Sequence, residues 1–357
     1  MSYTNGLDDP TAYFQTTLYT GDGSTTHAIT NGGNSDLQPD MVWIKDRGAA
    51  NWHSITDVAR GHSKAIFPND NAAEDTSNAY VKAFNSDGFT LGSAGSDVNA
   101  NSNTYVSWQW KANGSGNANT AGSINTTATS ANTTSGFSII TYTGNGSSGA
   151  TIGHGLSTAP QAVFIKKRTA ANWTVGHVGV GWTKNGKLNT IDSFGVSALS
   201  FNNTAPSTSL ITLGSGDVAN ANGGTYVCYA FSNIKGFSKM GSYTGNGNAN
   251  GPFCFTGFKP AFAIFKDITG DRDWTMLDNK RNTFNVMDKR LFPNNADAEN
   301  DTDILDFTSN GIKIRSTNTS VNVSGNTYIY MAFAENPFVT SSGVPATARW
   351  LCSYLLT

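Results

Sequence analysis

The densest group of chemically capable side chains follows Trp52 and consists of His53, Asp57, Arg60 and Glu74. A histidine, carboxylates and a cation can form a catalytic site, since such sites are recognised in space rather than in sequence. The alternative is that these side chains hydrogen-bond to one another and order a long polar loop. No Gly-x-Ser-x-Gly nucleophile turn occurs in the chain, and we favour the loop interpretation.

Metal and cofactor chemistry has no sequence motif here. The five histidines never form His-Glu-x-x-His, and the three cysteines are widely separated. The acidic run 297–303 lacks the spacing of a calcium loop, so a solvated loop is the better interpretation. A pair of carboxylates for glycoside hydrolysis stays an alternative, because Asp and Glu are plentiful. No feature of the sequence singles out a particular pair. We therefore predict no catalytic residue, no metal ligand and no cofactor.

Three variable segments, 53–86, 174–203 and 275–308, hold most of the charge and are the natural place for binding loops. The residues in them that we single out as candidates for surface binding are His53, Arg60, His177, Trp182, Asp278 and Arg281.

The strands that must position these loops belong to a sequence unit that occurs three times in the chain. It opens on Tyr-Thr-Gly-Asx-Gly at residues 19–23, 142–146 and 243–247. A strand from Pro to Lys follows at 39–45, 160–166 and 260–266, then a Trp, and the unit closes at 104–110, 225–231 and 327–333. The Asx-Gly pair favours a tight turn with positive φ, and a phosphate-binding loop is disfavoured because no Lys-Ser/Thr follows.

Strand patterns predict where the core lies. The strands at 41–45 and 162–166 are apolar on both faces, so they should lie centrally with something packed over each face. Lys45, Lys166 and Lys266 then mark the strand ends, and we favour a charge where the chain leaves the core over a ligand role. The closing strands alternate large apolar residues on one side. We expect the core anchors of the repeats to be Trp43, Trp52, Trp108, Phe164, Trp173, Tyr229, Phe265, Trp274 and Met331, with sugar stacking by Trp52, Trp173 and Trp274 as the alternative.

The fold prediction is all-β, with three antiparallel β-sandwich units of jelly-roll or lectin type in tandem. An N-terminal arm, expected to be loose, covers 1–13, unit 1 covers 14–112, a flexible linker rich in Gly, Ser, Thr and Asn covers 113–135, unit 2 covers 136–235, unit 3 covers 236–338 and an apolar tail covers 339–357.

Composition excludes several classes of function. Charged residues make up 13%, about half the usual ~25%, and the net charge is −2 with no basic run, which argues against a nucleic-acid partner. No apolar stretch reaches the ~20 residues of a membrane helix, and the N-terminus has no signal-peptide pattern. We expect a protein that is made in a cytoplasm and does not insert into membranes.

The landmarks together resemble a known family. Unit 1 carries Asp9-Pro-Thr-Ala-Tyr-Phe14 and Asn103-Thr-Tyr-Val-Ser-Trp-Gln-Trp-Lys111, and unit 3 carries Lys239-Met-Gly-Ser-Tyr-Thr-Gly-Asn-Gly247 and Tyr330-Met-Ala-Phe-Ala-Glu-Asn-Pro-Phe338. This is similar to repeat-containing virion structural proteins of tailed bacteriophages, notably marine and cyanobacterial phages, which resemble tail fibres or spikes. The resemblance covers nearly the whole chain. It implies a virion component built of β-domains and carries over no catalytic residue.

Three functions follow from these features. The favoured one is a non-enzymatic tail fibre or spike component that mediates attachment to the host surface. The second is a decoration or cement protein that stabilises the capsid, and the third and least favoured is a depolymerase of envelope polysaccharide. Expected partners are other virion proteins, further copies of this chain in a homo-oligomer (a trimer is favoured) and a host envelope glycan. The expected place of action is the virion exterior.

Overall fold

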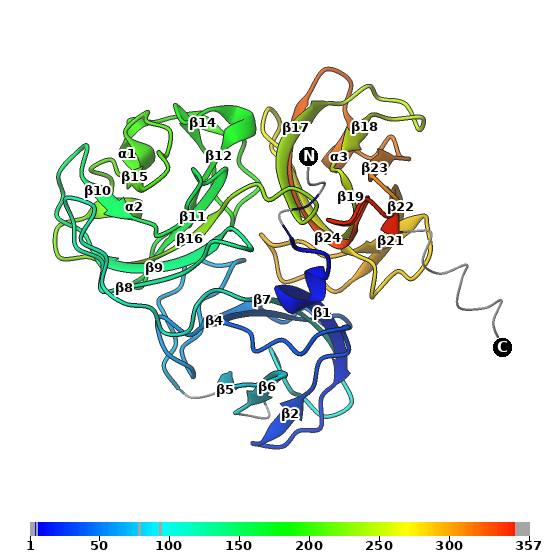
Figure 1. Ribbon diagram of the computed structural model, residues 1–357, viewed down its shortest axis with the longest axis horizontal. Coiled ribbons are helices and arrows are strands. Elements are labelled where there is room, and N and C mark those ends of the chain that lie inside the picture. Colours follow the sequence, from blue (N-terminus) through cyan, green and yellow to red (C-terminus); the bar gives the residue numbers. More distant parts are fainter. Residues whose placement is uncertain (1–3, 5, 78–79, 93–94, 347–357) are drawn as a thin grey trace.

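The computed structural model describes residues 4, 6–77, 80–92 and 95–346. Figure 1 shows three lobes around a common centre, coloured blue, green and yellow to red along the chain. Each lobe contains one of the three sequence units. The prediction of an all-β antiparallel fold is confirmed, since the helices are single turns and each β-sheet is built within one unit.

Unit 1 has an inner sheet of order β1-β7-β3-β4 and an outer sheet of order β2-β6-β5. Its elements are η1 (Pro10–Ala12), β1 (Phe14–Thr20), β2 (His27–Ile29), β3 (Met41–Asp46), β4 (Ser54–Asp57), β5 (Val81–Asn85), β6 (Gly88–Leu91) and β7 (Thr104–Trp110).

Unit 2 repeats the inner sheet as β9-β16-β11-β12 and adds β8 at its edge, while β10 and β15 form a small outer sheet and β13 and β14 a third pair. Its elements are β8 (Ala128–Asn132), β9 (Phe137–Thr143), β10 (Thr151–Gly153), β11 (Ala162–Lys167), β12 (Thr174–His177), η2 (Val178–Val180), β13 (Lys184–Asn185), β14 (Gly195–Val196), α1 (Ala198–Phe201), β15 (Leu210–Thr212), α2 (Asp217–Asn220) and β16 (Thr225–Phe231).

Unit 3 has the inner sheet β17-β24-β19-β20 and the outer sheet β18-β23-β22-β21. Its elements are β17 (Ser238–Thr244), β18 (Phe253–Phe255), β19 (Phe258–Asp267), β20 (Thr275–Asp278), β21 (Met287–Arg290), β22 (Asn300–Thr308), β23 (Gly311–Ile314), α3 (Thr319–Asn322) and β24 (Thr327–Pro337). The inner sheets of all three units therefore share one strand order.

The inner sheets are buried on both faces because they separate two kinds of core. In β3, Val42 and Ile44 pack into the core of unit 1, whereas Met41 and Trp43 belong to a cluster shared by all three units, the central core. The closing strand β16 divides in the same way, with Tyr229 and Phe231 in the central core and the alternate residues in the core of unit 2. The prediction of centrally placed strands with a layer over each face is confirmed, and the second layer is the other two units.

The turn motif adopts the predicted conformation. The second glycine has positive φ in each copy, at Gly23, Gly146 and Gly247. A Cβ on the first glycine, as at Gly21, would lie 2.2 Å from a backbone oxygen, so the close approach itself requires glycine. The residue between the glycines donates its N–H to a buried asparagine of the same unit, Asn99, Asn220 or Asn322.

Two of the expected connecting segments are more structured than their composition indicates. In the segment 113–135, expected to be a flexible linker, residues 128–132 form β8 and pair with β9 along their whole length. In the arm expected to be loose, Leu7 is buried in the central core and Asp9 caps η1. Burial of Leu7 and backbone pairing of β8 outweigh the polar composition of their surroundings. In the tail, residues 347–357 lie outside the described residues.

Candidate functional site: a polar groove between units 1 and 3

The six residues proposed for surface binding are all buried: His53, Arg60, His177, Trp182, Asp278 and Arg281. That prediction is wrong, because the segments that carry five of them pack against the next unit rather than facing solvent. Trp182 lies in the core of unit 2, where its ring meets Phe201 edge-on at 5.4 Å. We call the three contacts between units junction 1–2, junction 2–3 and junction 3–1.

At junction 1–2 a buried ion network joins the units. Arg60 Nε lies 2.5 Å from Asp57 Oδ2, and its Nη1 lies 3.0 Å from Glu74 Oε2. From unit 2, Arg168 Nη2 lies 2.6 Å from Glu74 Oε1, and the Tyr229 hydroxyl donates to Asp57 Oδ2 at 2.6 Å. Burial raises the pKa of Glu74, but the bonds from the two arginines outweigh it and hold that pKa below its usual value.

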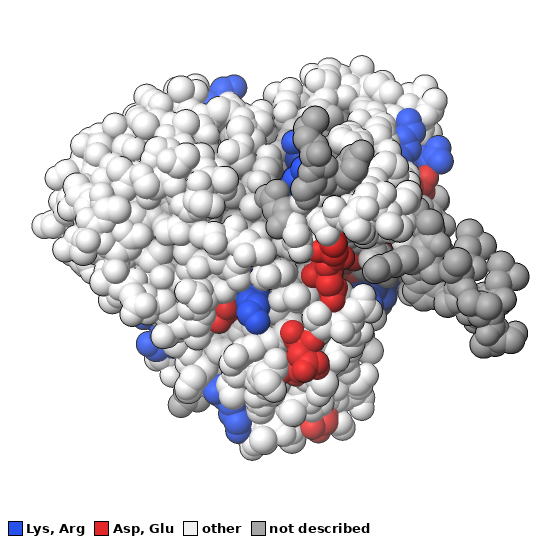
Figure 2. Space-filling view, in the orientation of Figure 1, with Lys and Arg blue, Asp and Glu red and all other residues white. Residues whose placement is uncertain are grey.

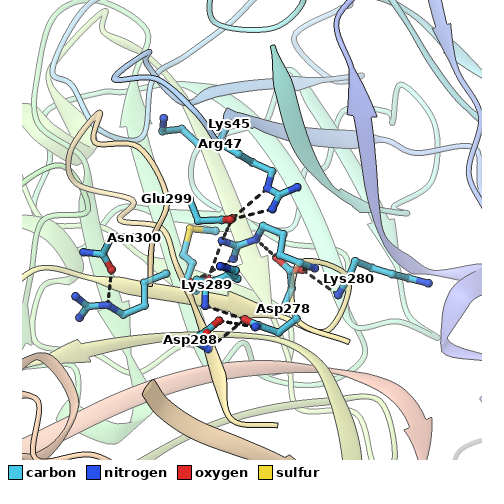
Figure 3. A network of polar contacts seen from close by, with 12 residues as sticks. Lys45, Arg47, Asp278, Lys280, Asp288, Lys289, Glu299 and Asn300 are labelled. Carbon is cyan, nitrogen blue, oxygen red and sulfur yellow. Dashed lines mark hydrogen bonds and ion pairs between the residues drawn. The ribbon is translucent and has the colours of Figure 1, made fainter. Parts of the chain in front are cut away.

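Junction 3–1 repeats this network with other residues (Figure 3). Arg281 lies 2.6 Å from Asp278 and 3.0 Å from Glu299, and Arg47 of unit 1 closes on Glu299 at 2.8 Å. Trp108 of unit 1 donates its Nε1–H to Asp278 Oδ2 at 3.1 Å, in the place of Tyr229. Every charge in this network is used to hold one unit on the next.

Among the residues that the structure describes, junction 2–3 has no counterpart of this ion network. The N–H of Phe194 donates to the carbonyl of Ile268, as Glu74 does to Arg168 and Glu299 to Arg47, so Phe194 and Ile268 replace an ion pair. His177 stands at the position of Asp57 and Asp278, with Nε2 3.2 Å from the carbonyl of Tyr330. Burial lowers the pKa of His177 to about 4, and this imidazole is therefore neutral at pH 7.

The three strand-end lysines lie where the sequence predicts, but they are buried instead of solvated. Lys166 Nζ donates to four backbone carbonyls, one of them that of Asn71 in unit 1. Lys266 Nζ donates to the carbonyl of Ile191 in unit 2 at 2.7 Å, and Lys45 Nζ to that of Ala49 at 3.0 Å. Burial lowers the pKa of each to about 8. These lysines satisfy turn carbonyls at the unit boundaries.

Among the proposed core anchors, Trp52 is the exception, since its side chain is 38% exposed while the others are buried. His53 directly precedes β4, as Trp173 precedes β12 and Trp274 precedes β20, so His53 takes the inward position and Trp52 lies one residue before it. The N–H of each of these three donates to an equivalent asparagine, Asn69 for His53. Trp43 Nε1 donates to His53 Nδ1 at 2.9 Å, and burial holds the pKa of His53 well below its usual value.

Junction 3–1 contains hollow space. A cavity of about 60 Å³ lies between β1 of unit 1 and the start of the loop after β20. A groove of about 400 Å³ adjoins it, and the two share Asn279, Lys280 and Glu335 in their walls. The groove is lined by Lys259, Asn279, Lys280, Asn282, Thr283, Phe284, Asn285, Met287, Phe307 and Glu335.

An extension of the third copy forms one wall of this groove. The stretch from Asp278 to Asn294 is four residues longer than the matching stretches from Asp57 to Asn69 and from His177 to Asn189. The extended loop presents Phe284, whose side chain is 83% exposed. Asn282 and Asn285 fix the loop, the first by bonds to Asp288 and the second by pairing with the backbone of Phe307. The aromatic ring is thus held out on an anchored loop.

The inner cavity holds polar atoms that the other junctions do not have. Strand registers place Thr16 at the position of Ile139 and Met240, which are apolar and buried in the central core. Equivalent backbone bonds place Asn279 at the position of Val58 and Val178. Among the described residues, Thr16 Oγ1 and Asn279 Oδ1 are buried and have no hydrogen-bond partner.

The charges around the groove are few. Lys259 Nζ lies 2.7 Å from Glu335 Oε2, so these two neutralise each other. The side chain of Lys280 extends away from the Asp278 and Glu299 network in Figure 3, and among the described residues it has no ion-pair partner. Figure 2 shows that Lys, Arg, Asp and Glu are scattered sparsely over the face it displays. The site therefore combines unpaired polar atoms, an exposed ring and one unpaired cation.

The sequence signal for this groove was the longer third copy, which alignment of the Trp and Asn landmarks could have revealed. Within the described residues, no group of three or more His, Cys, Asp and Glu is placed to hold a metal ion. Helices long and apolar enough to cross a membrane are likewise not found in this part of the chain.

Comparison with known proteins gives a family without an assigned activity. No curated protein and no solved structure matches the chain. Residues 9–337, which span all three units, match the family described as Domain of unknown function (DUF7483). The chain belongs to this DUF7483 family.

Proposed function

We propose that this chain is a non-enzymatic structural protein of a bacteriophage virion, a tail fibre or spike component that mediates attachment to the host surface. The resemblance of its repeat landmarks to such proteins gives the context. The groove at junction 3–1 carries the binding part of the proposal, because Phe284 stands exposed beside unpaired polar atoms on a rigid body. Binding residues on loops held by a rigid scaffold are a common arrangement.

The arrangement of the three units is suited to holding a binding site in place outside the cell. The buried networks at junctions 1–2 and 3–1 and the shared aromatic core hold the units in one arrangement. A rigid scaffold lowers the entropic cost of binding, because the site is preorganised. The expected homo-oligomer stays a prediction, and the mass of the purified protein in solution, measured by light scattering, tests it.

The experiment is adsorption of the purified chain to host cells and to extracted envelope polysaccharide, with new reducing ends assayed in the same tube. Saturable binding without new reducing ends is expected. Release of reducing ends would overturn the non-enzymatic role, and absence of binding would overturn attachment. Antibody labelling of intact particles should place the protein on the virion exterior.

A capsid decoration or cement protein is the second candidate. The edge strand β18 exposes Phe253 and Phe255, at 47% and 61%, next to Phe338 at 37%. Such an exposed aromatic patch suits contact with another virion protein. Copy number per particle separates the two roles, since a cement protein is present in numbers that match the capsid lattice and a tail fibre in a few copies.

A further inference from the structure

We propose that the groove at junction 3–1 binds an acidic saccharide, with a sugar hydroxyl in the inner cavity and the ring of Phe284 against the sugar. This rests on the attachment role proposed above and names its ligand class. The argument uses the repeat as an internal comparison, because the same scaffold occurs at two further junctions without these features.

The unpaired polar atoms are the first reason to infer a ligand. A buried polar group without a hydrogen bond costs roughly 1–3 kcal/mol. Ile139 and Val58 show that the scaffold accepts apolar residues at the positions of Thr16 and Asn279. Polar residues at these two places carry a cost that a ligand with hydroxyl groups removes when the side chains of Thr16 and Asn279 turn toward it, since a hydroxyl can donate to Asn279 Oδ1 and accept from Thr16 Oγ1.

The dimensions fit a branched, hydroxylated ligand. The inner cavity of about 60 Å³ has room for a hydroxymethyl group or several waters, since one water needs roughly 10–15 Å³ of such volume. It is too small for a sugar ring. The outer groove of about 400 Å³ lies within the range of small-molecule sites and admits a ring.

The exposed ring and the cation define the rest of the ligand. Phe284 offers a flat apolar surface for the C–H face of a sugar, and it belongs to the extension that units 1 and 2 lack. Lys280 stands where units 1 and 2 have Ala59 and Gly179, so the positive charge is also specific to this junction. Because Lys259 is neutralised by Glu335, the groove keeps one unpaired cation, which favours a carboxylate or sulfate on the sugar.

The test measures binding of the full-length chain to alginate, an acidic polysaccharide, with dextran as a neutral one and polyglutamate as an acidic polymer without sugars. The groove variants are Phe284→Ala, Lys280→Gln, and Thr16→Ile combined with Asn279→Val, which installs the residues found at junction 1–2. Phe255→Ala, another exposed phenylalanine, and Lys184→Gln in unit 2 are the matched controls.

Wild type should prefer alginate to both other polymers at 0.15 M salt. Phe284→Ala and the double variant should each weaken alginate binding about tenfold or more. Lys280→Gln should weaken alginate binding and flatten its salt dependence. The two controls should bind as wild type does.

Equal binding of polyglutamate and alginate would overturn the saccharide, and equal binding of dextran and alginate the acidic group. Groove variants within twofold of wild type would overturn the site. Phe284→Ala decides alone if the double variant does not fold, because the ring is exposed. Failure of wild type to bind either polysaccharide overturns the ligand class, whereas the attachment role is decided separately by adsorption to cells.

Discussion

Replacement of Arg60 by Val should destabilise the whole chain, not unit 1 alone. The guanidinium is buried and bonds Asp57, Glu74 and the carbonyl of Ile55. Its removal leaves the Asp57 carboxylate, which is fully buried, with the Tyr229 hydroxyl and the backbone N–H of residue 60 as its only donors among the described residues. Breaking a buried ion pair from one side costs about 3–5 kcal/mol.

The corresponding shift in melting temperature follows from the size of the cooperative unit. If the residues 9–337 unfold together, the entropy of unfolding is about 0.7 kcal/mol/K at roughly 2.1 cal/mol/K per residue. A loss of about 4 kcal/mol then lowers the melting temperature by about 6 °C. Unfolding of unit 1 by itself would involve about a third of that entropy, and the shift would be about three times larger.

Urea unfolding followed by tryptophan fluorescence and by far-ultraviolet circular dichroism measures the free energy, and calorimetry measures the melting temperature. Lys187→Val is the control, because both side chains of the Lys187–Asp192 pair are about half exposed, at 44% and 50%, and the loss of an exposed pair costs at most about 1 kcal/mol. Arg60→Lys keeps the positive charge but loses the guanidinium that bonds Asp57 and Glu74 at once. Its loss of stability should lie between the losses of Arg60→Val and the control variant. A loss below about 1 kcal/mol for Arg60→Val, or separate transitions for the two probes in wild type, would refute the reasoning.

Three further predictions concern single buried positions. Because burial lowers the pKa of His177 to about 4, the unfolded chain binds more protons than the folded one between that pH and about 6.5, and stability is lost on acidification through this window. Urea titrations at pH 7 and pH 4.5 measure how much unfolding free energy each protein loses between the two pH values. This loss should be smaller in His177→Gln than in wild type by up to about 3 kcal/mol, and an equal loss in the two proteins would contradict the prediction. Lys166, whose pKa burial lowers to about 8, should contribute stability that rises with pH from about 8 to about 10.5, so the curve of Lys166→Met should be flatter there; an unchanged slope would count against a buried ammonium. Gly176→Ala places a Cβ 2.5 Å from Trp182 and should cost about 1–3 kcal/mol by overpacking, and a melting temperature equal to wild type would show that the two rings move aside.

Much of the fold is predictable from the sequence, because strand burial leaves a local pattern. The repeat landmarks mark the same strands in each unit, and the double-sided apolar run around Trp43 indicates a layer over each face. The Asx-Gly turns follow from the positive φ that glycine adopts without strain. What covers the second face is not a local property, so the central core shared by three units was not predictable from the strand pattern.

The residues of the candidate site were even less predictable from local sequence patterns than the central core. The sequence marks Arg60, Asp278 and Arg281 as charged residues in variable segments, and such residues are mostly exposed. Their burial depends on partners far away in the chain, such as Arg47 and Glu299, which are 252 residues apart. His53 likewise takes the inward position directly before β4 that Trp173 and Trp274 hold in the other units, and Trp52, one residue earlier, is left exposed.

The sequence by itself determined the all-β class, the three units and their strands, because periodicity and turn residues act within a few positions of the chain. Only the tertiary structure decided which polar groups are used between units and which are left over. Thr16 and Asn279 line one cavity although they belong to different units and lie 263 residues apart in the chain. Hydrogen bonds and desolvation are set by neighbours in space, and junction 3–1 shows that a repeated scaffold can leave polar atoms without partners at one junction where the matching positions elsewhere are apolar.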